Sequence, residues 1–155
     1  MSRAYASMVD ALVPVSTANN FHNIIYTPTT VAVAVRPQIY DLLVSSGATP
    51  ADNVCDWQLL RTTVAAPTGG TAVTPSACNS LDSAAAVLAM KGSTGGSTAS
   101  VALMYFAVNQ RVTWRWCAVP GGEIVIPSQI NLGCGLGIVS STGYPASDSV
   151  IFFTE

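Results

Sequence analysis

Residues 99–118, ASVALMYFAVNQRVTWRWCA, contain two runs rich in β-branched and aromatic residues, separated by the polar stretch Asn-Gln-Arg. Such runs, bounded by polar residues, are typical of β-strands. In the second run Trp114 and Trp116 share one face of the strand, and Arg115 lies on the other. Two tryptophan side chains are costly to leave in water, so we expect both in the core and Arg115 at the surface or in an interface.

Two other roles for these tryptophans stay open at the level of sequence. A platform that stacks on sugars or nucleobases would need exposed rings beside several polar partners. A contact between subunits is the third interpretation, because Trp and Arg are both enriched at protein interfaces. The core interpretation is the simplest of the three, because it needs no partner.

The strand pattern recurs along the whole chain, with clusters of Gly, Pro, Asn and Ser between the runs. Strands are expected at residues 8–15, 21–26, 30–36, 39–45, 54–64, 71–74, 99–108, 110–118, 123–126, 134–140 and 149–154. The Pro-Gly-Gly turn at 120–122 predicts that the strands on either side form a hairpin arm, with Arg111 and Arg115 on its outer face. One stretch, 80–90, has a capping serine and aspartate before three alanines, which predicts a short helix.

These elements predict an all-β fold, a single β-sandwich or jelly-roll domain that spans residues 1–155. Two stretches rich in Gly, Ser and Thr, at 66–71 and 91–100, are expected to form surface loops at the ends of the sandwich. The chain has no internal repeat and no linker with a change of composition on both sides, so a second domain is not expected.

The chain is poor in charge, since 9% of its residues are charged against a usual value of about 25%, and 50% are apolar. With six Lys and Arg and a net charge of −2, it lacks the basic surface that nucleic acids require. No apolar run reaches the roughly 18 residues of a membrane span, and the N-terminus does not read as a signal peptide. We therefore expect a protein made in the cytoplasm, with its apolar excess buried between subunits.

Two of the expected strands are apolar on both faces, unlike a strand with one face in water. Residues 99–108 place Tyr105 on one face and Phe106 on the other, and residues 149–154 do the same with Phe152 and Phe153. Such a strand is either central in a core or covered by another subunit. The expected interface comprises Tyr105, Phe106, Arg111, Arg115, Phe152 and Phe153.

The sequence contains no arrangement that predicts catalysis, a cofactor or a metal, so we expect a protein that is not an enzyme. His22 is the single histidine, and no serine lies in a GxSxG motif. The glycines of LGCGLGIV, 132–139, lack the spacing of a dinucleotide loop and fit a strand pressed against a neighbouring backbone. Asp52 and Asp56 are close in sequence but too sparse for calcium or a glycosidase site. The four cysteines form no CxxC pair and are expected to be buried, reduced thiols.

Three segments together resemble a known class of proteins. They are WQLLRTTVAAPTGGTAVTPSACNSLDSAAAV at 57–87, VNQRVTWRWCAVPGGEIVIPSQINLGCGLGIVSST at 108–142, and SVIFFTE at 149–155. Read in order, they resemble small β-rich virion proteins of tailed bacteriophages, of the capsid decoration or cement type. The features that carry the likeness are an arginine followed by threonines, a Gly/Thr-rich loop, a Leu-Asp segment and a strand pair around Pro-Gly-Gly.

The resemblance implies a jelly-roll subunit on the capsid surface of a virion, without cofactor or enzymatic role. Its implied partners are the major capsid protein and further copies of itself, in a homotrimer. One departure concerns the Leu-Asp segment, where a second Asp often follows in such proteins. Ser83 and Ala84 stand there in this chain, which removes the basis for a salt bridge or a metal in that segment.

The alternative function is a carbohydrate- or receptor-binding jelly-roll module of a phage tail, fibre or head-tail component. Its contacts would come from the loops at 66–71 and 91–100. An exposed aromatic ring beside polar side chains on a loop would favour this alternative. Buried tryptophans, with apolar faces shared between copies, would favour the capsid role.

Overall fold

The computed structural model describes residues 3–12, 21–27, 36–47, 49–63, 65–96, 98–126, 131–138 and 148–154 of the 155-residue chain. Among these, the side chains of residues 9–12, 22, 63, 99 and 148–154 are outside the description. The described residues form twelve strands and no helix, which confirms the all-β class.

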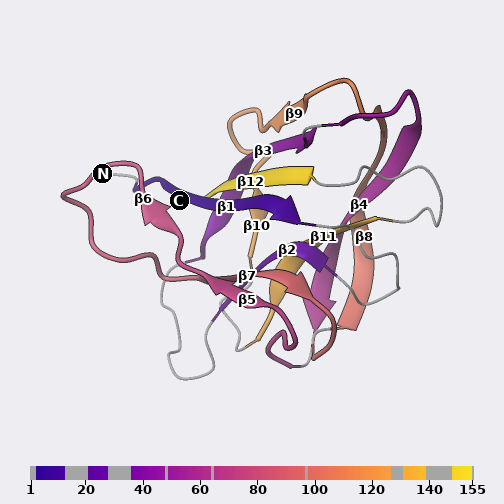
Figure 1. Ribbon diagram of the computed structural model, residues 1–155. Coiled ribbons are helices and arrows are strands. Elements are labelled where there is room, and N and C mark those ends of the chain that lie inside the picture. Colours follow the sequence, from indigo (N-terminus) through magenta and orange to yellow (C-terminus); the bar gives the residue numbers. More distant parts are fainter. Residues whose placement is uncertain are drawn as a thin grey trace.

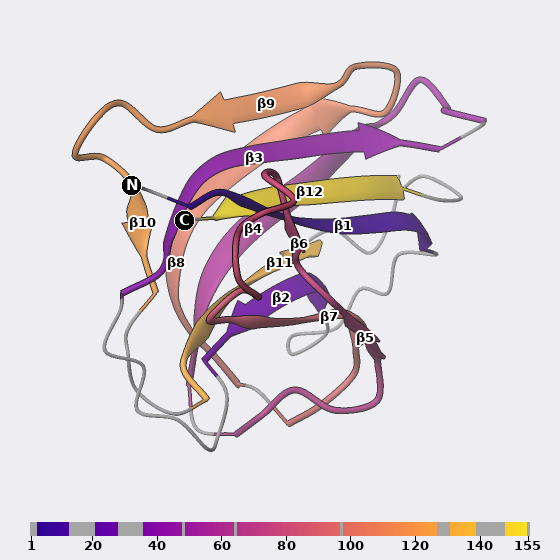
Figure 2. The same ribbon diagram turned by 90° about the vertical axis from the view of Figure 1, so that its left-hand side faces the viewer.

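The strands form two antiparallel sheets (Figures 1 and 2). The first contains β1 (Tyr5–Leu12), β3 (Gln38–Ser46), β6 (Ser76–Ala77), β9 (Trp114–Cys117), β10 (Ile124–Val125) and β12 (Asp148–Thr154). Its order is β10-β3-β12-β1-β6, and β9 also pairs with β3. The second contains β2 (Phe21–Tyr26), β4 (Val54–Thr63), β5 (Thr71–Val73), β7 (Leu88–Ser93), β8 (Thr98–Asn109) and β11 (Gly133–Ile138). Its order is β5-β7-β2-β11-β4-β8.

One apolar cluster draws side chains from both sheets. Leu42 and Val44 come from β3 in the first sheet, and Leu59 and Leu136 come from β4 and β11 in the second. Each is 2% exposed or less, so the cluster excludes water. Alternation along a strand sends every second residue to this cluster, which is why the strand pattern was readable from the sequence.

The glycines of β11 behave as the sequence predicted. A Cβ placed on Gly135 would lie 2.3 Å from the ring of Phe21, closer than any real contact allows. Phe21 is buried together with Ile24 and Leu60 in a second, smaller cluster. Glycine at 135 therefore lets an aromatic ring lie directly on the strand. The predicted close approach of a neighbouring backbone is found at Gly133, where a Cβ would lie 2.1 Å from the Ile25 carbonyl oxygen.

The strand predictions hold for most of the described chain. β2 coincides with the predicted 21–26, and β3, β4, β5, β8 and β12 differ by one residue at one or both ends. β1 begins earlier than predicted, at Tyr5, and β9 is shorter, because residues 110–113 form a turn. The predicted strand at 30–36 falls almost wholly outside the described residues.

Two predictions around residue 90 are wrong. Residues 80–87 form turns and bends in place of the expected helix, and β7 begins at Leu88. The expected loop at 91–100 is partly strand, because β7 continues to Ser93 and β8 begins at Thr98. Cross-strand pairing of β7 with both β2 and β5 outweighs the weak strand propensity of Lys91 and Gly92.

The expected hairpin arm is also wrong in its pairing. β9 pairs with residues 41–44 of β3, and β10 pairs with residues 38–39 of the same strand. The chain therefore follows a single edge of β3, and residues 118–123 loop out between the two short strands. The turn itself is as predicted: the Gly122 N–H donates to the Val119 carbonyl at 2.7 Å, and Gly121 has a φ of 83°. A positive φ after proline is the geometry of a type II turn, which favours glycine.

Candidate interaction surface

Strand β8 ends the second sheet and is neighboured by β4 on one side. Its inward face places Phe106 and Val108 in the main cluster. Its outward face leaves Tyr105 61% exposed, and Val101, in the irregular first half of the strand, is 56% exposed. The strand that looked apolar on both faces thus has one face in the core and one at the surface of the single chain.

Tyr105 has polar neighbours on strand β4. It pairs across the sheet with Gln58, and the Asp56 carboxylate lies near its phenol. Partial desolvation, together with the nearby negative charge of Asp56, raises the pKa of the Tyr105 phenol. The exposed ring is therefore held beside a carboxylate and an amide.

Phe106, which was predicted from the sequence to lie in the interface, is buried beneath a tryptophan. Its ring lies 3.8 Å, centroid to centroid, from that of Trp114, with 8° between the planes. The two rings join β8 of the second sheet to β9 of the first. Phe106 is 8% exposed, so it contributes to packing within the chain and offers no surface to a partner.

The tryptophans lie on the predicted face of β9 but are not fully buried. Trp114 and Trp116 are half-buried and pack against the main cluster, whereas Arg115 and Cys117 are exposed. β9 is an edge strand, so its inward side chains meet the core from one side only. The core prediction is right about the face and overstates the burial.

Arg115 binds a carboxylate that sequence reasoning missed. Asp41, on the neighbouring strand β3, is 3% exposed although its strand face is turned away from the main cluster. Arg115 Nε lies 3.0 and 3.1 Å from the two carboxylate oxygens, and its Nη2 donates to Oδ2. The hydrogen bond from Arg115 holds the pKa of Asp41 below its usual range, against the effect of burial, and the Cys117 side chain also hydrogen-bonds this carboxylate.

Arg111 lies in the turn between β8 and β9 and is exposed. Its Nη1 is 4.0 Å from Asp52 Oδ2, and both side chains are mostly in solvent. The turn is fixed by Asn109 instead, which donates to Asp52 at 2.8 Å and accepts the Arg111 backbone N–H at 2.9 Å. Arg111 is therefore accessible to a partner, and its own ion pair is weak.

Phe152 and Phe153 lie in β12, whose backbone alone is described. The register pairs Phe152 with Leu42 of β3 and with Ser7 of β1. It pairs Phe153 with Asp41. Their predicted interface role concerns side chains outside the described residues, so it stays a prediction.

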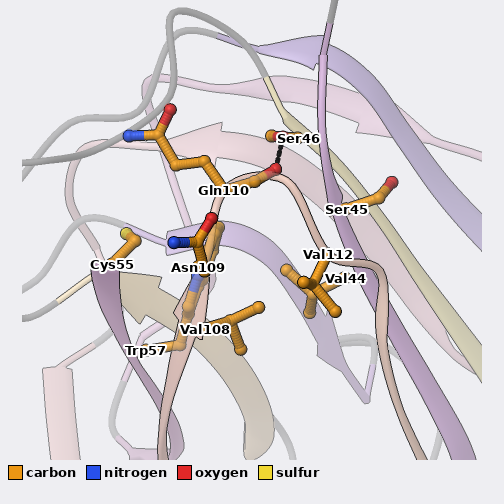
Figure 3. Close-up of a pocket in the computed structure, with 9 residues that line it drawn as sticks. All are labelled: Val44, Ser45, Ser46, Cys55, Trp57, Val108, Asn109, Gln110 and Val112. Atoms are coloured by element: carbon orange, nitrogen blue, oxygen red, sulfur yellow. Dashed lines mark hydrogen bonds between the residues drawn. The ribbon is translucent and has the colours of Figure 1, made fainter. Parts of the chain in front are cut away.

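The turn after β8 closes a small cavity at one end of the sheets (Figure 3). Gln110 fixes this turn by two hydrogen bonds: its carbonyl accepts one from the Ser46 hydroxyl, and its Oε1 accepts one from the Ala51 N–H at 2.9 Å. Val44, Trp57 and Val108 supply apolar walls. The cavity volume of about 10 Å³ leaves room for one water molecule at most, too little for a ligand.

The two Gly/Thr-rich stretches meet in space. The Thr68 N–H donates to the Gly95 carbonyl at 2.8 Å, and the Thr94 N–H donates to the Thr68 carbonyl at 3.0 Å. Ser93 is buried beside them and donates to the carbonyls of both Thr68 and Gly95. These loops carry no aromatic residue, so they lack the stacking platform that a sugar site would use.

The cysteines depart in part from the prediction. No disulfide joins them, but Cys78 and Cys117 are exposed, and only Cys55 and Cys134 are buried. Burial raises the pKa of the Cys134 thiol to about 12, and the charge of Arg61 acts in the opposite direction. A thiol with so high a pKa is neutral and behaves as a small apolar side chain.

Arg61 is a second residue whose role the sequence did not reveal. It lies beside Cys134 in the register of the second sheet, and its Nη1 donates to the Val125 carbonyl of β10 at 2.9 Å. It therefore ties the second sheet to the first. The available signal was a charged residue next to buried apolar side chains within a strand, as for Arg61 in QLLRTT and Asp41 in IYDLLVS.

In the described part of the chain, no three His, Cys, Asp or Glu side chains come close enough to hold a metal ion. Within the same residues, no helix is long and apolar enough to cross a membrane. No protein-family model matches the chain, and no curated protein or solved structure with which it was compared matches it either.

Proposed function

We propose that the protein is a structural subunit of a bacteriophage virion, a decoration or cement protein that binds the major capsid protein. In this proposal the two sheets form a β-sandwich of the jelly-roll type, and copies associate on the capsid surface as a homotrimer. The chain acts by covering surface of the shell and carries out no reaction.

The outward face of β8 is the observation that carries this proposal. Tyr105 is more than half exposed there, and so is Val101 nearer the start of the strand, in a chain with few charges to keep such a surface in water. Val54, at the end of the neighbouring strand β4, is also 56% exposed. Burying apolar area contributes about 25 cal/mol per Å² before ordering costs, so contacts repeated over many copies stabilise a shell.

The test uses head particles purified from the phage that encodes the chain, stripped of this protein and then mixed with it. We expect saturable co-sedimentation, particles that withstand a higher temperature when loaded, and density for the chain at regular positions in cryo-electron microscopy. Tyr105→Lys is expected to weaken binding, and Leu81→Lys, at a residue 91% exposed in a loop, serves as the matched control. Absence of the chain from virions, with no binding to stripped heads, would refute the proposal.

The carbohydrate-binding alternative rests on one observation, the exposed Tyr105 ring held beside Asp56 and Gln58. An aromatic face with a carboxylate and an amide is suited to stacking and hydrogen bonding with a sugar. Titration with a panel of neutral and acetylated oligosaccharides, followed by nuclear magnetic resonance, would detect it. Shifts confined to these three residues would favour the alternative over the capsid role.

A further inference from the structure

The edges of the two sheets differ in length. The other edge strands are short: β5 has three residues, β6 and β10 have two each, and β9 has four. Short edge strands are one way in which proteins avoid unwanted pairing with other chains. β8, the remaining edge strand, has twelve residues.

β8 also lacks charge and proline, two other features that protect an edge. Its sequence, TASVALMYFAVN, contains no charged residue and no proline. Register shifts in its pairing with β4 are confined to the first half, and Met104 to Asn109 pair without interruption. Among the described residues, no strand pairs with its other side. A long, uncharged edge whose second half is regular is a template for the addition of another strand.

The second half of β8 is complementary to itself. Tyr105 and Ala107 are both exposed and share the outward face. When two copies pair antiparallel about Phe106, each Tyr105 lies opposite Ala107 of the second copy, so a large side chain meets a small one. No like charges meet along the strand, because it carries none.

We propose that two copies of the chain associate through β8, in antiparallel register, so that their second sheets form one continuous sheet. Pairing about Phe106 overlaps residues 103–109 of the two copies, a stretch about 24 Å long, and a strip about 10 Å wide along it has an area of about 240 Å² per copy. This is below the usual 800 Å² or so of a stable interface, so the pairing is weak in free solution and strengthened when copies are held on an assembly. The twofold contact is compatible with a threefold contact elsewhere, since both occur together in dihedral assemblies.

The test uses the purified chain alone, so it is independent of any capsid. In sedimentation velocity across about 1–300 μM, the sedimentation coefficient is expected to increase with concentration as copies associate. Ala107→Lys is expected to shift this increase to a concentration at least about tenfold higher. Asp56 lies opposite Ala107 and accommodates the lysine, so the fold is expected to be unaffected. Leu81→Lys, which places the same charge on a loop, is expected to associate as the native chain does.

Hydrogen exchange gives a second readout that identifies the surface. At high concentration, amides of β8 are expected to exchange more slowly than at low concentration, and those of the short edge strand β5 are not. A monomer at all concentrations, or association that Ala107→Lys leaves unchanged, would overturn the β8 pairing. A trimer insensitive to Ala107→Lys would overturn it as well and would leave the proposed capsid role standing.

Discussion

Arg111 and Arg115 lie four positions apart in the same stretch, and each meets an aspartate, but the two ion pairs differ. Arg115 makes several short contacts with a carboxylate that is 3% exposed. Arg111 lies 4.0 Å from a carboxylate that is itself in solvent. Both arginine side chains are largely exposed, with 59% and 61% of their surface in solvent. Burial of the acceptor, and not of the arginine, therefore decides which pair contributes to folding.

The aromatic residues nearby divide in the same way. Phe106 and Trp114 stack between the two sheets, whereas Tyr105, one residue earlier, lies on the outward face. The inner side of this stretch thus holds the fold together, and the outer side is free for a partner. Substitutions on the two sides test this division.

Trp114→Ala is expected to have the largest effect, a loss of about 3 kcal/mol in the free energy of unfolding. This value lies at the lower end of the usual range for replacing a core tryptophan by alanine, because the Trp114 ring is half-buried. Tyr105→Ala is the matched outer change and is expected to cost no more than about 1 kcal/mol. Urea denaturation measures both values. Equal losses would show that the inner and outer sides do not differ as the structure indicates.

Arg115→Ala follows, with an expected loss of about 2 kcal/mol, because Asp41 is left without its cation. The loss is smaller than for a fully buried pair, because solvent reaches the carboxylate once the arginine side chain is removed. Adding Asp41→Asn to Arg115→Ala is expected to recover part of it, since the remaining buried charge is then gone. If the double variant is less stable than Arg115→Ala, the ion-pair explanation fails.

The same pair predicts a dependence on pH. The pKa of Asp41 is lower in the folded chain than the value of about 3.9 in an unfolded one, so the pair stabilises the fold fully above about pH 4. This contribution is lost as the pH falls through the lowered pKa of the folded state. The difference in unfolding free energy between the native chain and Asp41→Asn is therefore expected to shrink below pH 4. A difference that stays constant from pH 7 to pH 2 would contradict the assignment.

Much of this division could be predicted from the sequence, and the missing part has a physical cause. Alternation placed Trp114 and Arg115 on opposite faces, because side-chain direction along a strand is a local property. It did not find Asp41, because the partner strand and its register are set by contacts between distant residues. For the same reason β9 and β10 read as a hairpin, although each pairs with β3. The burial of Phe106 likewise depends on which strand lies across from it.

Arg111→Ala is expected to have the smallest effect, a change of less than about 0.5 kcal/mol in the free energy of unfolding. The turn does not depend on the arginine side chain, because Asn109 supplies its hydrogen bonds to Asp52 and to the Arg111 backbone. Asn109→Ala is the matched change at this turn, and we expect it to cost about 1 kcal/mol by removing both bonds. Urea denaturation of the two variants, at low and at 0.5 M salt, separates the ion pair of Arg111 from the hydrogen bonds of Asn109, since salt screens only the interaction between charges. If Arg111→Ala costs as much as Arg115→Ala, then exposure of the aspartate does not set the strength of these pairs, and Arg111 belongs to the fold and not to the free surface.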